Sequence, residues 1–241
     1  EATGGDKTLI AEKRMLMERI DGFAEQNPML GLRGCRLGIV YPILPEMQVR
    51  AIATASAKLK KEGLDPKPEI MIPLVSTVAE LGKPRPVAEK TTAEVAAEEG
   101  VELDIEVGTM IELPRAAVTA DEIATQADFF SFGTNDLTQT TFGFSRDDVE
   151  AEFVPQYLQE HLLPYNPFAT IDPGVAKLVE MGVKLGHEGN PDLVCGVCGE
   201  HGGDPDSIHT FNKIGLDYVS CSPYRVPVAR LAAAQAALEE E

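Results

Sequence analysis

Short apolar runs alternate with longer helix-like stretches along most of the chain. The runs are continuously apolar, as expected for strands that are covered on both faces. Helix-like stretches between them supply crossover connections, which favour parallel strands. The pattern therefore predicts an α/β fold with five strand–helix units, whose strands lie at 69–75, 104–113, 128–133, 193–198 and 217–221.

Helical periodicity is clearest in the first quarter of the chain. Apolar residues at helical spacing predict an amphipathic helix over 7–26, which ends before Pro28 because the residue ahead of a proline avoids the helical region. Pro45 can open a second helix that runs to about Glu62 and is stopped by Gly63.

Three further local signals complete the predicted arrangement. The apolar stretch 34–40 is a candidate sixth strand. Thr119, followed three residues later by Glu122, matches a capping box that opens a helix. The alanine-rich end of the chain predicts a last helix over 226–238.

Composition limits the classes of partner. The chain has 241 residues and a formal net charge of -18, so it repels the phosphate backbone of nucleic acids. No run of about 18 apolar residues occurs, so no membrane span is expected. No signal peptide is visible, and four cysteines are too few for a disulfide scaffold. We expect a cytoplasmic location, with a plastid or another organelle as the alternative.

Polar residues suited to chemistry follow the predicted strands. Glu112, Asn135, Asp136 and Cys198 all lie at carboxyl ends of these strands, where parallel α/β folds place their active sites. A doubly wound open sheet would also accommodate five or six strands. Such a sheet normally carries a glycine-rich phosphate loop, and neither G-x-G-x-x-G nor G-x-x-x-x-G-K-[ST] occurs in the sequence.

The two acidic residues among them form a candidate metal site. A buried carboxylate costs free energy unless it is paired or binds a cation. Glu112 and Asp136 would suit Mg²⁺, which prefers oxygen ligands and retains several waters. The structural alternative is that each carboxylate caps a helix or pairs with an arginine such as Arg115.

Two short segments could bind an anion. The backbone N–H groups of Gly133 and Thr134, with the amide of Asn135, could hold a carboxylate or phosphoryl oxygen, although a plain strand–helix turn explains the segment as well. Arg33 and Arg36 flank a glycine and could recognise an anion through bidentate contacts. The alternative is a pair of solvated surface arginines.

The Cys195-x-x-Cys198 motif, with His201 close behind it, allows three interpretations. These are a zinc site with Cys221 as a further ligand, a redox pair, and a single catalytic cysteine. Residues three apart on an extended strand point to opposite faces, which argues against chelation and against a disulfide. Cys198 at the strand end is then the exposed thiol, and His201 is a candidate for orienting it.

Six segments taken together resemble the PEP-utilising enzyme family, in the family's order. The resemblance runs from residue 27 to the end of the chain. The segments are NPMLGLRGCR (27–36), EIMIPLV (69–75), GTMIELPR (108–115), FFSFGTNDLTQ (129–139), GVCGEHGGD (196–204) and VSCSPYRVPVAR (219–230).

Four segments are more similar to the pyruvate phosphate dikinase branch than to two other branches of this family, namely 33–36, 142–148, 198–204 and 220–227. Those branches are the phosphoenolpyruvate synthases and enzyme I of the sugar phosphotransferase system. The resemblance implies a (β/α)8 barrel of which about the last five strands are present. It divides the chain into a helical lead-in, 1–26, and a barrel domain, 27–241.

The resemblance also implies roles for individual residues. Glu112 and Asp136 would be Mg²⁺ ligands, and Cys198 would be the proton donor. Other expected contributions are substrate contacts from Arg33, Gly133, Thr134 and Asn135, and supporting positions near the cysteine for Ser131 and Tyr218.

The implied partners are pyruvate or phosphoenolpyruvate (PEP), a phosphohistidine domain and an ATP-grasp domain of a longer enzyme, and a second copy in a homodimer. The expected activity is phosphoryl transfer between the phosphohistidine and pyruvate enolate. A binding module that retains the pocket without turnover is the alternative from another class.

Overall fold

The structure is a computed structural model that describes residues 7–22 and 27–239, in two units. The first unit ends at Arg33 and contains helix α1 (Lys7–Asp21) and the short 3-10 helix η1 (Pro28–Leu30). The predicted helix over 7–26 is thus present up to Asp21, and residues 23–26 lie outside the described part. The predicted domain boundary after residue 26 stays a prediction.

The second unit is built on a parallel five-stranded sheet whose strand order follows the sequence. Each strand falls within one of the predicted apolar runs, so the α/β class and the five strands are confirmed. The strands are β1 (Glu69–Ile72), β2 (Glu106–Ile111), β3 (Phe129–Phe132), β4 (Val194–Val197) and β5 (Tyr218–Val219).

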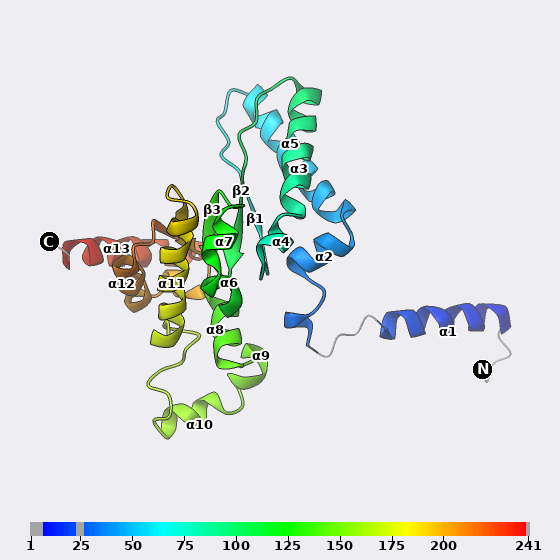
Figure 1. Ribbon diagram of the computed structural model, residues 1–241. Coiled ribbons are helices and arrows are strands. Elements are labelled where there is room, and N and C mark those ends of the chain that lie inside the picture. The colour runs from blue at the N-terminus through cyan, green and yellow to red at the C-terminus, as the bar shows by residue number, and fades with distance from the viewer. Residues whose placement is uncertain (1–6, 23–26, 240–241) are drawn as a thin grey trace. The chain divides into compact units, whose positions relative to one another are not determined.

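Helices connect and cover the strands (Figure 1), with α3 against α5, α11 against α6 and α7, and α12 against α13. Five sequential parallel strands joined by helical crossovers are arranged as in part of a (β/α)8 barrel. The helices are α2 (Gly34–Val40), α3 (Ile43–Lys61), α4 (Val78–Leu81), α5 (Pro84–Glu99), α6 (Pro114–Val118), α7 (Ala120–Ala124), α8 (Thr134–Phe142), α9 (Arg146–Val149), α10 (Val154–Gln159), α11 (Pro173–Gly189), η2 (Glu200–Gly203), α12 (Pro205–Ile214), η3 (Pro223–Arg225) and α13 (Val226–Glu239). Within the described ranges, no helix has the length and apolar character needed to cross a membrane.

The candidate sixth strand at 34–40 is wrong, because this segment forms helix α2. Gly34 adopts a left-handed φ of +54°, and the Cys35 amide donates a hydrogen bond to the Pro73 carbonyl, 2.9 Å away. The segment therefore packs across the end of β1 instead of pairing with it. A short apolar run does not by itself distinguish a strand from a buried helix.

The capping box predicted at Thr119 is also wrong. Thr119 follows directly after α6, where its hydroxyl donates to the Arg115 carbonyl (3.0 Å) and makes no capping hydrogen bond to α7. The described structure has a capping box at Thr77, whose hydroxyl accepts from the Glu80 amide (3.2 Å) at the start of α4. The sequence pattern occurs at both places, and the preceding helix decides which threonine caps.

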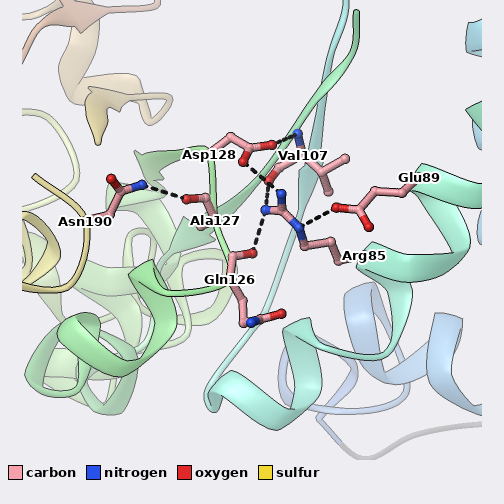
Figure 2. Close-up of polar contacts among 7 residues, drawn as sticks. All are labelled: Arg85, Glu89, Val107, Gln126, Ala127, Asp128 and Asn190. Atoms are coloured by element: carbon pink, nitrogen blue, oxygen red, sulfur yellow. Dashed lines mark hydrogen bonds and ion pairs between the residues drawn. The ribbon is translucent and has the colours of Figure 1, made fainter. Parts of the chain in front are cut away.

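An arginine forms hydrogen bonds near the amino ends of β2 and β3, as Figure 2 shows. Arg85 of α5 donates to the carbonyls of Val107 (3.0 Å) and Gln126 (2.8 Å) and to the Asp128 carboxylate (2.8 Å). Asp128 in turn accepts from the Val107 amide (2.8 Å). This network links α5 to the starts of β2 and β3, at the edge that supports stability in this kind of fold.

Candidate functional site

The candidate site lies at the opposite edge, where β2, β3 and β4 end. Glu112 follows β2, the segment from Gly133 to Asp136 follows β3, and Cys198 follows β4. Because these strands are neighbours in register, the structure brings together residues that are far apart in the sequence.

Glu112 is held in place by a backbone amide from the segment that follows β1. Its side chain is buried, with 2% exposed, and its Oε1 accepts a hydrogen bond from the Leu74 amide at 2.6 Å. Leu74 adopts a left-handed φ of 59°, which is uncommon for a residue with a side chain. Such backbone strain persists where the surroundings fix it and is concentrated at functional sites. The sequence contained no signal for this contact.

Gly133 is required by the closeness of the Glu112 side chain. A Cβ at position 133 would lie 2.6 Å from Glu112 Oε2 and 2.7 Å from Met110 Cε. The Glu112 carboxylate therefore lies directly against the backbone at the start of α8. The segment after β3 is therefore directly beside the carboxylate that follows β2.

Asn135 and Asp136 lie half-buried in the first turn of α8. Asp136 Oδ1 accepts a hydrogen bond from Gln139 Nε2 at 2.8 Å. Asn135 Oδ1 accepts from the Glu200 amide at 3.0 Å, which links the turn after β3 to the segment after β4. The Asn135 side chain is therefore oriented by the next strand–helix connection.

The Cys198 thiol is half-buried beside both carboxylates. Its Sγ lies 3.7 Å from the Phe132 carbonyl oxygen. Burial raises the pKa of Cys198, a hydrogen bond with Ser131 opposes this, and the negative charges of Glu112 and Asp136 raise it further. The sulfur therefore keeps its proton at neutral pH.

Ser131 and Tyr218 lie next to this thiol, as the resemblance implied. Burial raises the pKa of Tyr218, and a hydrogen bond with Ser131 opposes that increase. The tyrosine ring lies flat against the backbone of β4, because a Cβ at Gly196 would be 2.2 Å from Tyr218 Cζ. Ser131 thus contacts both Cys198 and Tyr218 from β3.

His201 is fully buried and contacts Thr134. Its Nε2 lies 2.9 Å from the Pro167 carbonyl, which can only accept, so Nε2 carries the proton. Nδ1, 2.8 Å from Thr134 Oγ1, then accepts from that hydroxyl. Burial lowers the pKa of His201, so the ring is neutral at pH 7. Its predicted support of the site would act through Thr134.

The same contacts bear on the zinc hypothesis. Both ring nitrogens of His201 are engaged by the protein, and burial raises the pKa of Cys195 to about 12. Within residues 7–22 and 27–239, no three His, Cys, Asp or Glu side chains gather in a way that could hold a metal ion. Two carboxylates completed by water and ligand oxygens match the coordination of Mg²⁺.

Acidification below pH 6.5 is expected to destabilise the fold through His201. Burial lowers its pKa in the folded chain from the ordinary value of 6.5, so the unfolded chain takes up this proton first. Stability is full above pH 6.5 and declines by up to about 1.4 kcal/mol per pH unit below it. Urea unfolding between pH 7.5 and 5 measures the slope. His201→Gln removes this titration, and an unchanged slope in that variant would contradict the assignment.

Arg33 belongs to the first unit, where its Nη1 contacts Met29 Sδ at 3.2 Å. Its role in substrate binding stays a prediction.

A polar pocket of about 230 Å³ lies beside Cys198. Asn135 forms part of its wall, and the connection after β5 supplies Ser220, Ser222 and Arg225, which the sequence pattern had not marked as functional, together with Cys221. Its lining residues are Asn135, Cys198, Gly199, Glu200, Ser220, Cys221, Ser222 and Arg225. The sequence did offer one signal for Arg225, because it is a basic residue shortly after a predicted strand in a very acidic chain.

Comparison with known proteins decides the family. Residues 3–238 match the model of the PEP-binding domain of PEP-utilising enzymes. The chain belongs to the PEP-utilising enzyme family. Similar family members include pyruvate, phosphate dikinase 1 of Arabidopsis thaliana, 55% identical over 95% of this chain and 24% of the relative. Another is pyruvate, phosphate dikinase of Clostridium symbiosum, 53% identical over 92% of this chain and 26% of the relative.

The chain spans about a quarter of the length of these PEP-utilising relatives. The solved structure of a citrate lyase from Burkholderia xenovorans has a similar fold, with a TM-score of 0.51 and 16% identity over 78% of this chain and 53% of that chain. This likeness supports the barrel-type architecture of the second unit and extends no further than the fold.

Proposed function

We propose that the chain forms the PEP and pyruvate site of a pyruvate, phosphate dikinase. The proposed half-reaction moves a phosphoryl group between a phosphohistidine and the enolate of pyruvate. The observation that carries the proposal is the gathering of Glu112, Asp136 and Cys198 at adjacent strand ends, in a chain 53% to 55% identical to two such dikinases.

Glu112 and Asp136 would hold one Mg²⁺, with water and substrate oxygens as the remaining ligands. Their donor set fits the ion, because both are carboxylates and the Glu112 oxygen is positioned against the α8 backbone. When bound, the ion supplies Lewis-acid stabilisation of negative charge on the substrate's oxygens.

The protein's own side chains account for binding and proton transfer. The Leu74 amide fixes one oxygen of Glu112, and the turn at Gly133 and Asn135 orients a substrate carboxylate. Cys198 donates its proton to C3 of the enolate and becomes a thiolate; in the reverse direction the thiolate removes a proton from the pyruvate methyl group. Arg33 is proposed to neutralise charge on the transferring phosphoryl group.

The partners of the complete reaction are proposed by likeness to the dikinases. They are a phosphohistidine domain, an ATP-grasp domain that binds ATP, and a second copy in a homodimer. A cytoplasmic location is proposed, with a plastid as the alternative because the Arabidopsis relative is named chloroplastic.

Calorimetric titration of the chain with PEP, with and without Mg²⁺, tests the proposal. We expect PEP binding that requires Mg²⁺, in a sample whose cooperative thermal unfolding establishes that it is folded. Absence of binding in such a sample would contradict the proposal. Binding without exchange of the pyruvate methyl protons would support the alternative of a binding module that lacks turnover.

A further inference from the structure

Gln139 connects the Asp136 carboxylate to the chain that returns after α8. Its Nε2 donates to Asp136 Oδ1 at 2.8 Å, and its Oε1 accepts from the Arg146 backbone amide at 2.8 Å. A backbone N–H can only donate, so the Arg146 amide fixes which end of the Gln139 side chain is the oxygen. The Nε2 group is then the end that faces Asp136.

The turn that ends α8 brings Arg146 to Gln139. Gly143 follows the helix in a left-handed conformation, with a φ of 68°, and its amide donates to the Gln139 carbonyl. The Phe144 amide donates to the same carbonyl at 2.9 Å. Gln139 therefore accepts hydrogen bonds from the returning chain through both its backbone and its side chain.

The start of α9 is itself braced, so the Arg146 amide is a well-fixed donor. The Arg146 Nε lies 3.0 Å from Glu150 Oε2, and its Cζ lies 5.7 Å from the centre of the Phe168 ring. Asn166 Nδ2 donates to the other oxygen of Glu150 at 2.9 Å. An aspartate and a glutamine three positions apart on a helix often form a weak surface contact. The anchored amide distinguishes Gln139 from such a pair, because it restrains the Gln139 side chain from the other end.

We propose that Gln139 is a positioning residue for the metal ligand Asp136. The proposal rests on the proposed function, which assigns Mg²⁺ to Glu112 and Asp136. The hydrogen bond from Gln139 fixes the rotation of the Asp136 carboxylate, so that Asp136 binds the cation without first losing side-chain freedom. Groups that orient the ligands of a metal ion in this way contribute about 10-fold to 100-fold to its affinity.

Electron paramagnetic resonance of Mn²⁺, which takes the same oxygen ligands as Mg²⁺, measures the metal affinity of the chain without any turnover. Gln139→Met keeps the length of the side chain and removes both of its hydrogen bonds. This variant is expected to bind Mn²⁺ at least about 10-fold more weakly. At saturating Mn²⁺, its affinity for PEP in calorimetry should stay within about threefold of wild type, because the ligands themselves are intact. A loss of PEP affinity that excess metal does not restore would indicate general disruption of α8 and would overturn the proposal.

Gln156→Met is the matched control. Gln156 of α10 donates through its Nε2 to Glu160 Oε1 at 2.7 Å, so this substitution also removes an amide–carboxylate contact. Both residues are exposed, and the variant should leave the Mn²⁺ affinity within about twofold.

A comparison at Arg146 tests the contact that anchors Gln139. Arg146 is the first residue of α9, where proline is tolerated, and Ser145 before it is already extended (φ -95°, ψ 112°). Arg146→Pro and Arg146→Ala lose the same side-chain contacts, but only the proline variant lacks the backbone N–H. We expect Arg146→Pro to bind Mn²⁺ about threefold to 10-fold more weakly than Arg146→Ala. In the Gln139→Met background this difference should vanish, because the amide acts through Gln139.

A wild-type Mn²⁺ affinity in Gln139→Met would overturn the proposal, and so would a proline effect that persists in the Gln139→Met background. Should Gln139→Met fail to fold, the two Arg146 variants decide alone, and equal Mn²⁺ affinities in them would overturn it. Absence of Mn²⁺ binding in the folded wild-type chain would overturn it together with the metal site. Mn²⁺ binding that depends on Gln139, in a chain that does not bind PEP, would contradict the proposed function and leave the role of Gln139 in place.

Discussion

Replacing Cys198 with alanine is expected to slow proton exchange at the pyruvate methyl group by about 10²-fold to 10⁴-fold, the usual contribution of a positioned acid or base. The thiol is protonated at neutral pH because burial raises its pKa. It can therefore deliver a proton to the enolate. NMR detection of deuterium in the pyruvate methyl group, in D₂O with Mg²⁺, measures the exchange rate.

PEP affinity should stay within about threefold in Cys198→Ala, because this variant removes the proton donor and leaves the carboxylates and Asn135 in place. Cys198→Ser preserves the shape of the side chain and is expected to be similarly slow, since a hydroxyl is a much weaker acid than a thiol. Cys221→Ser removes the second thiol of the same pocket. Exchange that survives Cys198→Ala and is lost in Cys221→Ser would contradict the assignment.

Replacing Glu112 with glutamine is expected to weaken Mg²⁺-dependent PEP binding by at least about 100-fold. Changes to groups outside the ligand shell already reduce metal affinity by about 10-fold to 100-fold, and this change removes a charged ligand itself. The glutamine carbonyl can still accept from the Leu74 amide, so the fold should be preserved. Calorimetric titration with PEP at several Mg²⁺ concentrations provides the measurement.

Glu106→Gln is the matched control. Glu106 is the first residue of β2, whereas Glu112 follows its last residue, so Glu106 lies at the opposite edge of the sheet, where it is exposed. It removes the same charge and should leave Mg²⁺-dependent binding within about twofold. Glu112→Ala should cost a further 1–3 kcal/mol or so of folding free energy, because it leaves the Leu74 amide without its acceptor. Unaltered Mg²⁺-dependent binding in Glu112→Gln would rule out its role as a ligand.

The local sequence pattern was sufficient to predict the strands and the edge of the sheet at which the candidate site lies. Continuous apolar runs marked all five strands, because a parallel strand covered on both faces has a composition that differs from its flanks. Glu112 and Cys198 come directly after apolar runs, so the sequence alone located the carboxyl edge of the sheet. Their family motifs then suggested roles for them.

Local pattern failed where a neighbouring element competes for the same residue. The run 34–40 is apolar enough for a strand, but it forms helix α2, and its Cys35 amide donates to the Pro73 carbonyl after β1. Thr119 matches a capping box, yet its hydroxyl contacts the Arg115 carbonyl of the preceding helix and makes no capping hydrogen bond to α7. Both outcomes depend on which backbone groups lie nearest in the folded chain, and the spacing of residues along the sequence does not show this.

The sequence by itself determined the α/β class, the five strands and the positions of the candidate carboxylates and thiol at strand ends. Only the tertiary structure decided what orients them. The Leu74 amide on Glu112 joins residues 38 apart, and the Thr134 contact with His201 joins residues 67 apart. Strand identity depends on neighbours within a few positions, whereas these contacts depend on how whole strands pair and pack. That is why the Leu74 contact with Glu112 and the pocket beside Cys198 emerged only from the fold.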